Sequence, residues 1–117
     1  MNKPYDLEER TFLFAKECRN YIRSLSKTIS NIEDGKQLIR SSGSVGANYI
    51  EANEKLGEKD LVFRLKISRK EAKESKYWLR LLHELNPDQR SASDLLLFEI
   101  EELRKILSAI ITKTTKQ

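Results

Sequence analysis

Apolar side chains recur along this chain at alternating steps of three and four residues, a spacing that places them on one face of an α-helix. Four segments show the pattern, over residues 6–29, 31–56, 58–85 and about 91–111. The links between them are short, as in bundles whose consecutive helices run antiparallel. The pattern therefore predicts an all-α, up-down-up-down four-helix bundle.

Local signals predict where these helices end. Ser30 followed by Glu33 is typical of a capping box, which predicts the start of the second helix. Gly57 is expected to stop that helix, and Pro87 to follow the end of the third. Residues 112–117 are polar and are expected to fray. We expect one domain over the whole chain, with its core within residues 7–111.

One stripe of each helix is expected to face the core. Small residues in the second and third stripes indicate a close approach of the two backbones. The expected core residues are Phe14, Cys18, Tyr21, Leu25, Ile29, Leu38, Ser42, Val45, Tyr49, Ala52, Leu56, Leu61, Leu65, Ser68, Ala72, Ser75, Leu79, Leu82, Leu96, Ile100, Leu103, Leu107 and Ile110.

The second helix has another face of small and apolar residues, which includes Gly43, Gly46 and Ile50. A glycine inside a helix costs about 1 kcal/mol relative to alanine, so these two need a reason. Tight packing within the bundle is one explanation, and close contact with a neighbouring subunit is the other. The sequence leaves both open.

The third helix carries a second line of mixed character, with Glu71, Glu74, Trp78 and Leu81. A subunit interface with charge-assisted hydrogen bonds would account for both kinds of side chain, since tryptophan is a frequent interface anchor. A partly exposed edge of the bundle is the alternative. Together with the glycine face, this line forms the expected oligomer interface.

Basic residues gather on particular helix faces. The formal charge of +4 and pI near 9.2 are compatible with nucleic acid or an anionic membrane surface and identify neither. Bases on one helix face could bind phosphates, or could be an ordinary solvated surface. We expect no aromatic side chain among these basic residues, and we therefore expect them to contact phosphates and not nucleobases. These bases are Lys66, Arg69, Lys70, Lys73, Lys76 and Arg80 in the third helix, and Lys16, Arg19 and Arg23 in the first.

The sequence contains few residues that could form a catalytic or metal-binding site. The single cysteine, Cys18, lies on a core stripe and is expected to be a buried, unreactive thiol. The lone His83 lies off the core stripe and is expected to be solvated, and no Glu-x-x-His motif of a di-iron bundle is present. We expect no catalytic residue, metal or cofactor. Without a signal peptide or an apolar run long enough for a bilayer, the chain is expected to be cytoplasmic and to have no membrane partner.

Two motifs extend this interpretation. Residues 42–52 read SGSVGANYIEA, and residues 70–82 read KEAKESKYWLRLL. In this order they resemble the helix 2 and helix 3 signatures of bacterial four-helix bundle proteins, some of them encoded within intervening sequences of 23S rRNA genes. These proteins are often labelled S23 ribosomal protein. Ser75 stands where the family signature would have threonine, and the resemblance covers about residues 7–111.

The resemblance implies a four-helix bundle that forms a ring-like homopentamer. It also implies similarity to the accessory variability protein of diversity-generating retroelements, a basic pentameric barrel that binds nucleic acid and a reverse transcriptase. The family has no established enzymatic activity, so the resemblance implies no catalytic residue in this chain. We therefore expect a non-enzymatic homo-oligomer that binds RNA or DNA, with a reverse transcriptase or another nucleic-acid enzyme as a further partner. A structural or protein-interaction oligomer is the alternative.

Overall fold

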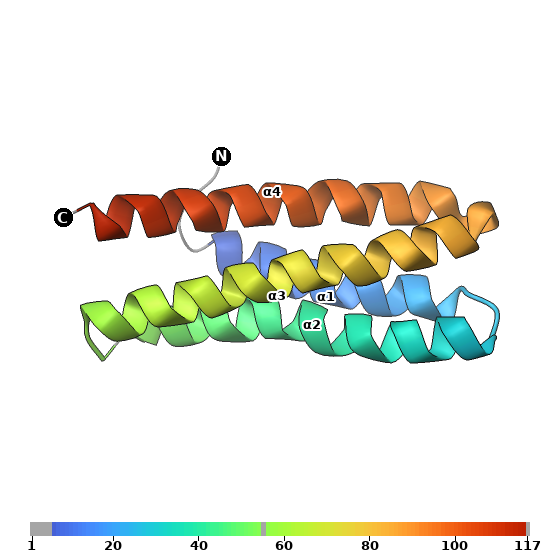
Figure 1. Ribbon diagram of the computed structural model, residues 1–117, viewed down its shortest axis with the longest axis horizontal. Coiled ribbons are helices and arrows are strands. Elements are labelled where there is room, and N and C mark those ends of the chain that lie inside the picture. Colours follow the sequence, from blue (N-terminus) through green and yellow to red (C-terminus); the bar gives the residue numbers. More distant parts are fainter. Residues whose placement is uncertain (1–5, 55, 117) are drawn as a thin grey trace.

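Four antiparallel helices make up the computed structural model, which describes residues 6–54 and 56–116 (Figure 1). They are α1 (Asp6–Arg23), α2 (Ile29–Glu54), α3 (Glu58–Leu85) and α4 (Arg90–Thr115), and the short 3₁₀ turn η1 (Pro87–Gln89) precedes α4. Each helix runs opposite to the one before it. The predicted all-α, up-down-up-down four-helix bundle is confirmed.

The four helices are not equivalent. α2 and α4 each pack against both α1 and α3, whereas α1 and α3 lie diagonally across the bundle, with no Cα atoms of the two helices within 8 Å of each other over the described residues. α1 has 18 residues and α3 has 28. Consequently α2, α3 and α4 extend past the start of α1, toward the end of the bundle where α2 turns into α3 (Figure 1).

The predicted core stripes are largely buried, but two of their terminal residues are not. Ile29 is 85% exposed and Leu56 is 95% exposed, so their assignment to the core was wrong. α1 ends at Arg23, six residues before the expected end, and a loop follows it. Ile29 therefore starts α2, while Leu56 lies between α2 and α3.

The start of α2 also differs from the prediction. The backbone N–H of Asn31 donates to Thr28 Oγ1 at 3.1 Å, so Thr28 caps the helix. Ser30 is already helical, and the predicted capping box is wrong. The prediction that Gly57 stops the second helix was wrong, because α2 ends at Glu54 and Gly57, with a φ of 153°, is the N-cap residue of α3.

α4 continues beyond its expected end. The Oγ1 atoms of Thr114 and Thr115 donate to the carbonyls of Ile110 and Ile111, each at 2.8 Å, and helical structure reaches Thr115. The prediction that the polar tail frays from residue 112 was therefore wrong for residues 112–115. Gln117 lies outside the described residues.

α2 and α3 meet along small side chains whose hydroxyls bond across the seam. Ser75 Oγ donates to Ser41 Oγ at 2.9 Å, and Ser68 Oγ donates to the carbonyl of Val45 at 2.7 Å. Together with Ala72, these residues are fully or almost fully buried. Their polar atoms would be costly to bury without partners, so the seam requires this alignment of the two helices.

Gly46 lies where α2 approaches α1. A Cβ added to Gly46 would be 2.8 Å from Thr11 Oγ1, and Thr11 is itself fully buried. At Gly43 an added Cβ would meet the tip of the Arg19 side chain at 3.3 Å. Packing within the bundle therefore explains Gly46, whereas Gly43 has a more adaptable neighbour.

A pair of buried amides fastens one end of the bundle. Asn31 and Asn86 each donate from Nδ2 to the other's Oδ1 at 2.9 Å. The remaining amide protons reach the carbonyls of Ser26 and Leu82 at 2.9 and 2.8 Å. The loop before α2 is thus tied to the turn after α3.

No helix in the described part of the chain combines the length and apolar character needed to cross a bilayer.

We expect Gly46→Ala to lower the free energy of unfolding by about 1–3 kcal/mol, because the added methyl group overlaps Thr11. Alanine's better helix propensity, about 1 kcal/mol, acts in the opposite direction and should be outweighed. Urea unfolding measures the difference. Gly43→Ala is the matched control and should cost less than Gly46→Ala, since the added methyl group meets only the tip of Arg19, at 3.3 Å; equal effects of both changes would contradict the close contact at Gly46.

Candidate nucleic-acid interface

One line of side chains on α3 faces solvent along most of the helix, and we call it the outer line. It lies opposite Leu65, Ala72 and Leu79, which face the core and thereby fix the rotation of the helix. Every member is exposed. The outer line consists of Lys59, Phe63, Lys66, Lys70, Lys73, Tyr77 and Arg80.

The five bases of the outer line form no salt bridge with any residue that the structure describes. Four of them, Lys66, Lys70, Lys73 and Arg80, were predicted as phosphate-binding residues. The structure brings these four together on one face. Lys59 extends the same line toward the start of α3 and was not identified from the sequence.

Two acidic residues next to the outer line, Glu71 and Glu74, face a single base of α2. Arg40 pairs with Glu74, and its Nη2 lies 3.3 Å from Glu71 Oε1. Trp78 Nε1–H donates to Glu74 Oε2 at 3.2 Å. The hydrogen bond from Arg40, followed by that from Trp78, lowers the pKa of Glu74. Arg40 therefore offsets one of the two negative charges beside the outer line, and the charge of Lys70 also helps to lower the pKa of Glu74.

The same geometry bears on the predicted oligomer interface. Glu71, Glu74 and Trp78 have partners within the chain, which agrees with the alternative of a bundle edge. Gly46 is covered by α1 and Leu81 is half-buried. Ile50 is exposed beside α1 and remains free to contact another molecule.

Two bases expected on the binding face turn toward α4 instead. Arg69 Nη1 donates to Ser108 Oγ at 3.4 Å, and Lys76 Nζ lies 3.2 Å from Glu101 Oε1. Arg104 also pairs with Glu101, at 2.6 Å. The hydrogen bond from Arg104, more than that from Lys76, lowers the pKa of Glu101 to about 2. Arg69 and Lys76 thus contribute to the contact between helices and less to the exposed charge.

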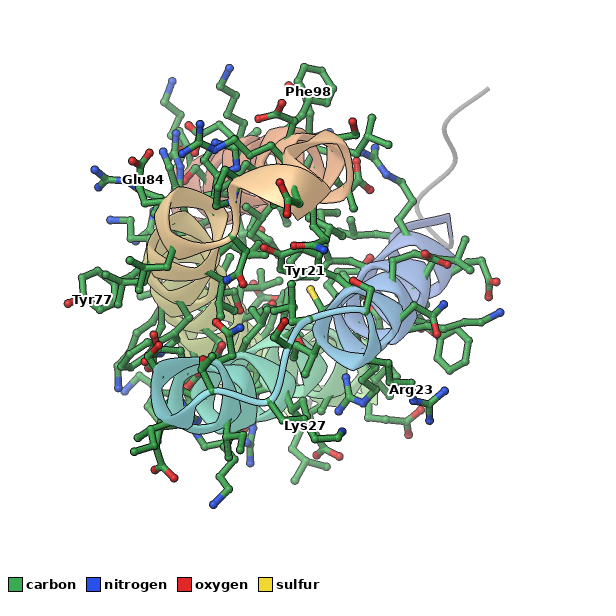
Figure 2. All side chains as sticks on the ribbon, turned by 90° about the vertical axis from the view of Figure 1, so that its right-hand side faces the viewer. Tyr21, Arg23, Lys27, Tyr77, Glu84 and Phe98 are labelled. Atoms are coloured by element: carbon green, nitrogen blue, oxygen red, sulfur yellow. The ribbon has the colours of Figure 1, made fainter. Side chains whose placement is uncertain are left out.

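The bases predicted on the first helix lie on the opposite side of the bundle. Figure 2 shows Arg23 and Tyr77 pointing away from each other across it. Lys16 is exposed like Arg23, whereas Arg19 crosses to α2 and donates to the carbonyl of Ile39 at 3.2 Å. The outer line and the α1 bases of the same chain therefore do not form one continuous face.

Two exposed aromatic rings lie within the outer line, so the expectation of no aromatic side chain there was wrong. Phe63 is 59% exposed and Tyr77 is 55% exposed. The ring of Tyr77 packs edge-on against Trp78, with a centroid separation of 5.0 Å. Figure 2 shows Tyr77 pointing outward from α3. The sequence alone could have shown this arrangement. One helical line at steps of three and four residues contains Phe63, Lys66, Lys70, Lys73 and Tyr77.

The groups with nucleophilic or acid–base chemistry lie elsewhere. Cys18 is fully buried, and burial raises its pKa to about 12, so its thiol is unreactive. His83 is partly buried: its Nδ1 is 2.6 Å from Ser93 Oγ, and its Nε2 is 3.6 Å from Asp94 Oδ1. The expectation of a solvated histidine was wrong. This set has the residue types of a hydrolytic triad, but Ser93 is fully buried and out of reach of a substrate.

Metal ligands do not cluster in residues 6–54 and 56–116, where no three His, Cys, Asp or Glu side chains come close enough to hold an ion.

Two apolar grooves flank α1. The groove toward α4 has a volume of about 430 Å³ and is lined by Leu13, Leu95 and other residues. The groove toward α2 has a volume of about 570 Å³ and includes Phe12 and Ile50. These four side chains are all exposed, so apolar surface remains uncovered on both sides of α1.

The fold and this surface define the class: a small antiparallel four-helix bundle with a basic outer face on α3. Within that class, the chain belongs to the 23S rRNA-intervening sequence protein family, whose model matches residues 4–109. A solved structure similar to it is a protein with unknown function from the S23 ribosomal protein family of Bacteroides thetaiotaomicron VPI-5482. The two are 28% identical, with a TM-score of 0.80, over 92% of this chain and 96% of the other. No functionally curated protein matches the chain.

The ion pairs of Glu101 with Lys76 and Arg104 predict that the free energy of unfolding falls as the solution becomes acidic. The pKa of Glu101 is about 2 in the folded chain against an ordinary 4.5, so its contribution is complete above about pH 4.5. It is lost as the pH falls from about 4.5 to about 2. We expect Glu101→Gln to reduce stability near pH 7 and to show a smaller further loss on acidification than the wild type. Urea midpoints at both ends of this range measure the effect; parallel losses in the two proteins would contradict it.

Proposed function

We propose that this chain is a non-enzymatic, self-associating cytoplasmic adaptor that binds nucleic acid through the outer line of α3. The observation that carries the proposal is the row of five bases without salt-bridge partners among the described residues, on one exposed helix face. A face whose purpose is solubility would normally mix both signs of charge. Here two acids beside this line, Glu71 and Glu74, pair with Arg40 of α2.

The dimensions of the outer line suit a polyanion. Lys59 and Arg80 are 21 residues apart, about 31 Å along a helix axis. Duplex DNA carries one charge per roughly 1.7 Å of its axis, so several phosphates lie within that length. Lysine and arginine contacts to phosphates fix the position of a nucleic acid and carry no sequence information directly. We therefore propose binding with little sequence preference.

Self-association would cover the apolar grooves on both sides of α1. A closed ring brings two different surfaces of each subunit together, and the two grooves provide two such surfaces. Assembly through them leaves α3 free, since α3 is diagonal to α1. Several outer lines in one particle would bind a long strand more tightly through effective concentration. The family resemblance suggests five subunits and an additional nucleic-acid enzyme, such as a reverse transcriptase, as a partner.

The outer line predicts a salt-dependent affinity. We expect the triple variant Lys66→Gln, Lys70→Gln and Lys73→Gln to bind RNA and DNA more weakly than the wild type. Loss of three phosphate contacts should reduce the slope of log affinity against log salt by about 2 to 3. Fluorescence anisotropy over a salt series starting near about 50 mM measures both quantities.

The matched control removes the same charge from three separate elements, by changing Lys27, Lys36 and Lys113 to Gln. It should weaken binding less and leave a steeper slope. Equal losses from the two triples would indicate diffuse charge attraction in place of a defined face. No binding by the wild type at low salt would support the structural-oligomer alternative, which the uncovered grooves beside α1 favour by themselves.

The grooves predict the oligomeric state. We expect the wild type to be larger than a monomer at micromolar concentration, as measured by light scattering after size exclusion. Phe12→Glu and Leu95→Glu should each yield smaller species, because each places a charge in one groove. Phe63→Glu, on the outer line, is the control and should leave the mass unchanged. A monomeric wild type, or loss of assembly in the control alone, would contradict this arrangement.

A further inference from the structure

We infer that the ligand of the outer line is an unpaired nucleic-acid strand, whose bases stack on Phe63 and Tyr77 while its phosphates contact the intervening lysines. This inference rests on the proposed function, and it names the class of nucleic acid.

The order of residues along α3 carries the inference. Phe63 and Tyr77 are fourteen residues apart, about 21 Å along the helix, and Lys66, Lys70 and Lys73 lie between them on the same line. Proteins that bind single strands place basic side chains along the path of the phosphate backbone. They combine these with aromatic rings on which nucleobases stack. A merely solubilising face has no need of two exposed rings among its charges.

The ring of Tyr77 is held in place by its neighbours. It packs edge-on against Trp78, whose indole N–H bonds to Glu74, and Glu74 is in turn held by Arg40 of α2. Its outward side is free, as Figure 2 shows. A ring fixed in advance loses little conformational freedom when a base stacks on it, which favours binding.

Phe63 lies at an open hollow of about 640 Å³ between α3 and α4. Lys59, Lys66 and Thr114 border the same hollow, together with Val62 and one acid, Glu58. The guanidinium of Arg64 lies over the Phe63 ring, 6.0 Å from its centroid. A nucleobase can stack on the Phe63 ring in this hollow. Lys59 and Lys66, on either side of the ring, can then contact the phosphates that flank that nucleobase.

Duplex nucleic acid suits this arrangement less well. Its bases are stacked on one another and present only their edges in the grooves, so a protein ring cannot stack on them without unstacking a step. That costs a few kcal/mol for each step. An unpaired strand presents base faces without this cost, and every base has such a face, so stacking tolerates any sequence.

The test compares a labelled strand of about 12 nucleotides with the duplex of the same sequence, in RNA and DNA forms, by anisotropy at one salt concentration. We expect the wild type to bind both unpaired strands more tightly than either duplex. The double variant Phe63→Leu and Tyr77→Leu should bind the single strands at least about 30-fold more weakly, since each lost stacking contact costs about 1–3 kcal/mol, with a smaller change for the duplexes. Tyr77→Phe keeps the ring and should bind like the wild type. Phe98→Leu, an exposed aromatic on α4, is the control and should have no effect.

Trp78 supplies a second readout, because it is the only tryptophan of the chain and touches Tyr77. Its emission should change when a single strand binds and change less with a duplex. Equal affinities for strand and duplex, or an unchanged affinity in the double leucine variant, would overturn this inference and leave the proposed function standing. Absence of binding to all four ligands at low salt would overturn both.

Discussion

The close approach of α2 and α3 is the constraint on which the other features of this bundle depend. The seam buries serine hydroxyls, and Ser68 and Ser75 bond across it to α2. A rotation of either helix would leave these polar atoms buried without partners, so the seam sets the rotation of α3 about its axis. That rotation directs Leu79 inward and Lys73 outward. The exposed basic face thus follows from how small residues pack on the opposite side of the same helix.

The sequence was sufficient for the fold because helical periodicity reports burial directly, and the four expected helices are all present. It failed at helix ends, where one hydrogen bond, such as that accepted by Thr28, decides between neighbouring positions. It also missed Gly35, a third helical glycine, which lies beside Ile22 of α1. For the candidate site, the sequence identified the charges but could not tell which of two adjacent lines on α3 faces solvent. That depends on α4, because Arg69 and Lys76 bond to Ser108 and Glu101 of that helix.

Charge is partitioned in this molecule according to its use. Arg19, Arg40 and Arg104 work as contacts between or along helices, and their guanidinium groups meet carbonyls or carboxylates of the chain itself. Arginine suits such contacts because its planar group donates several hydrogen bonds at once. The exposed bases of α3 are mostly lysines, whose flexible stems can follow a ligand. A net charge of +4 therefore says little about a face whose bases form no salt bridge with the described residues.

The paired amides of Asn31 and Asn86 make the two ends of the bundle unequal. Near this pair, four amide protons are satisfied and two loops are joined across 55 residues of sequence. At the other end, among the residues that the structure describes, α2, α3 and α4 extend beyond the start of α1 at Asp6. Local opening requires the least free energy where fewest apolar contacts are broken. Backbone amide exchange should therefore form a gradient along the long axis, fast beside Gly57 and slow toward the asparagines, so that the start of α3 is the part of the bundle most able to adjust its shape.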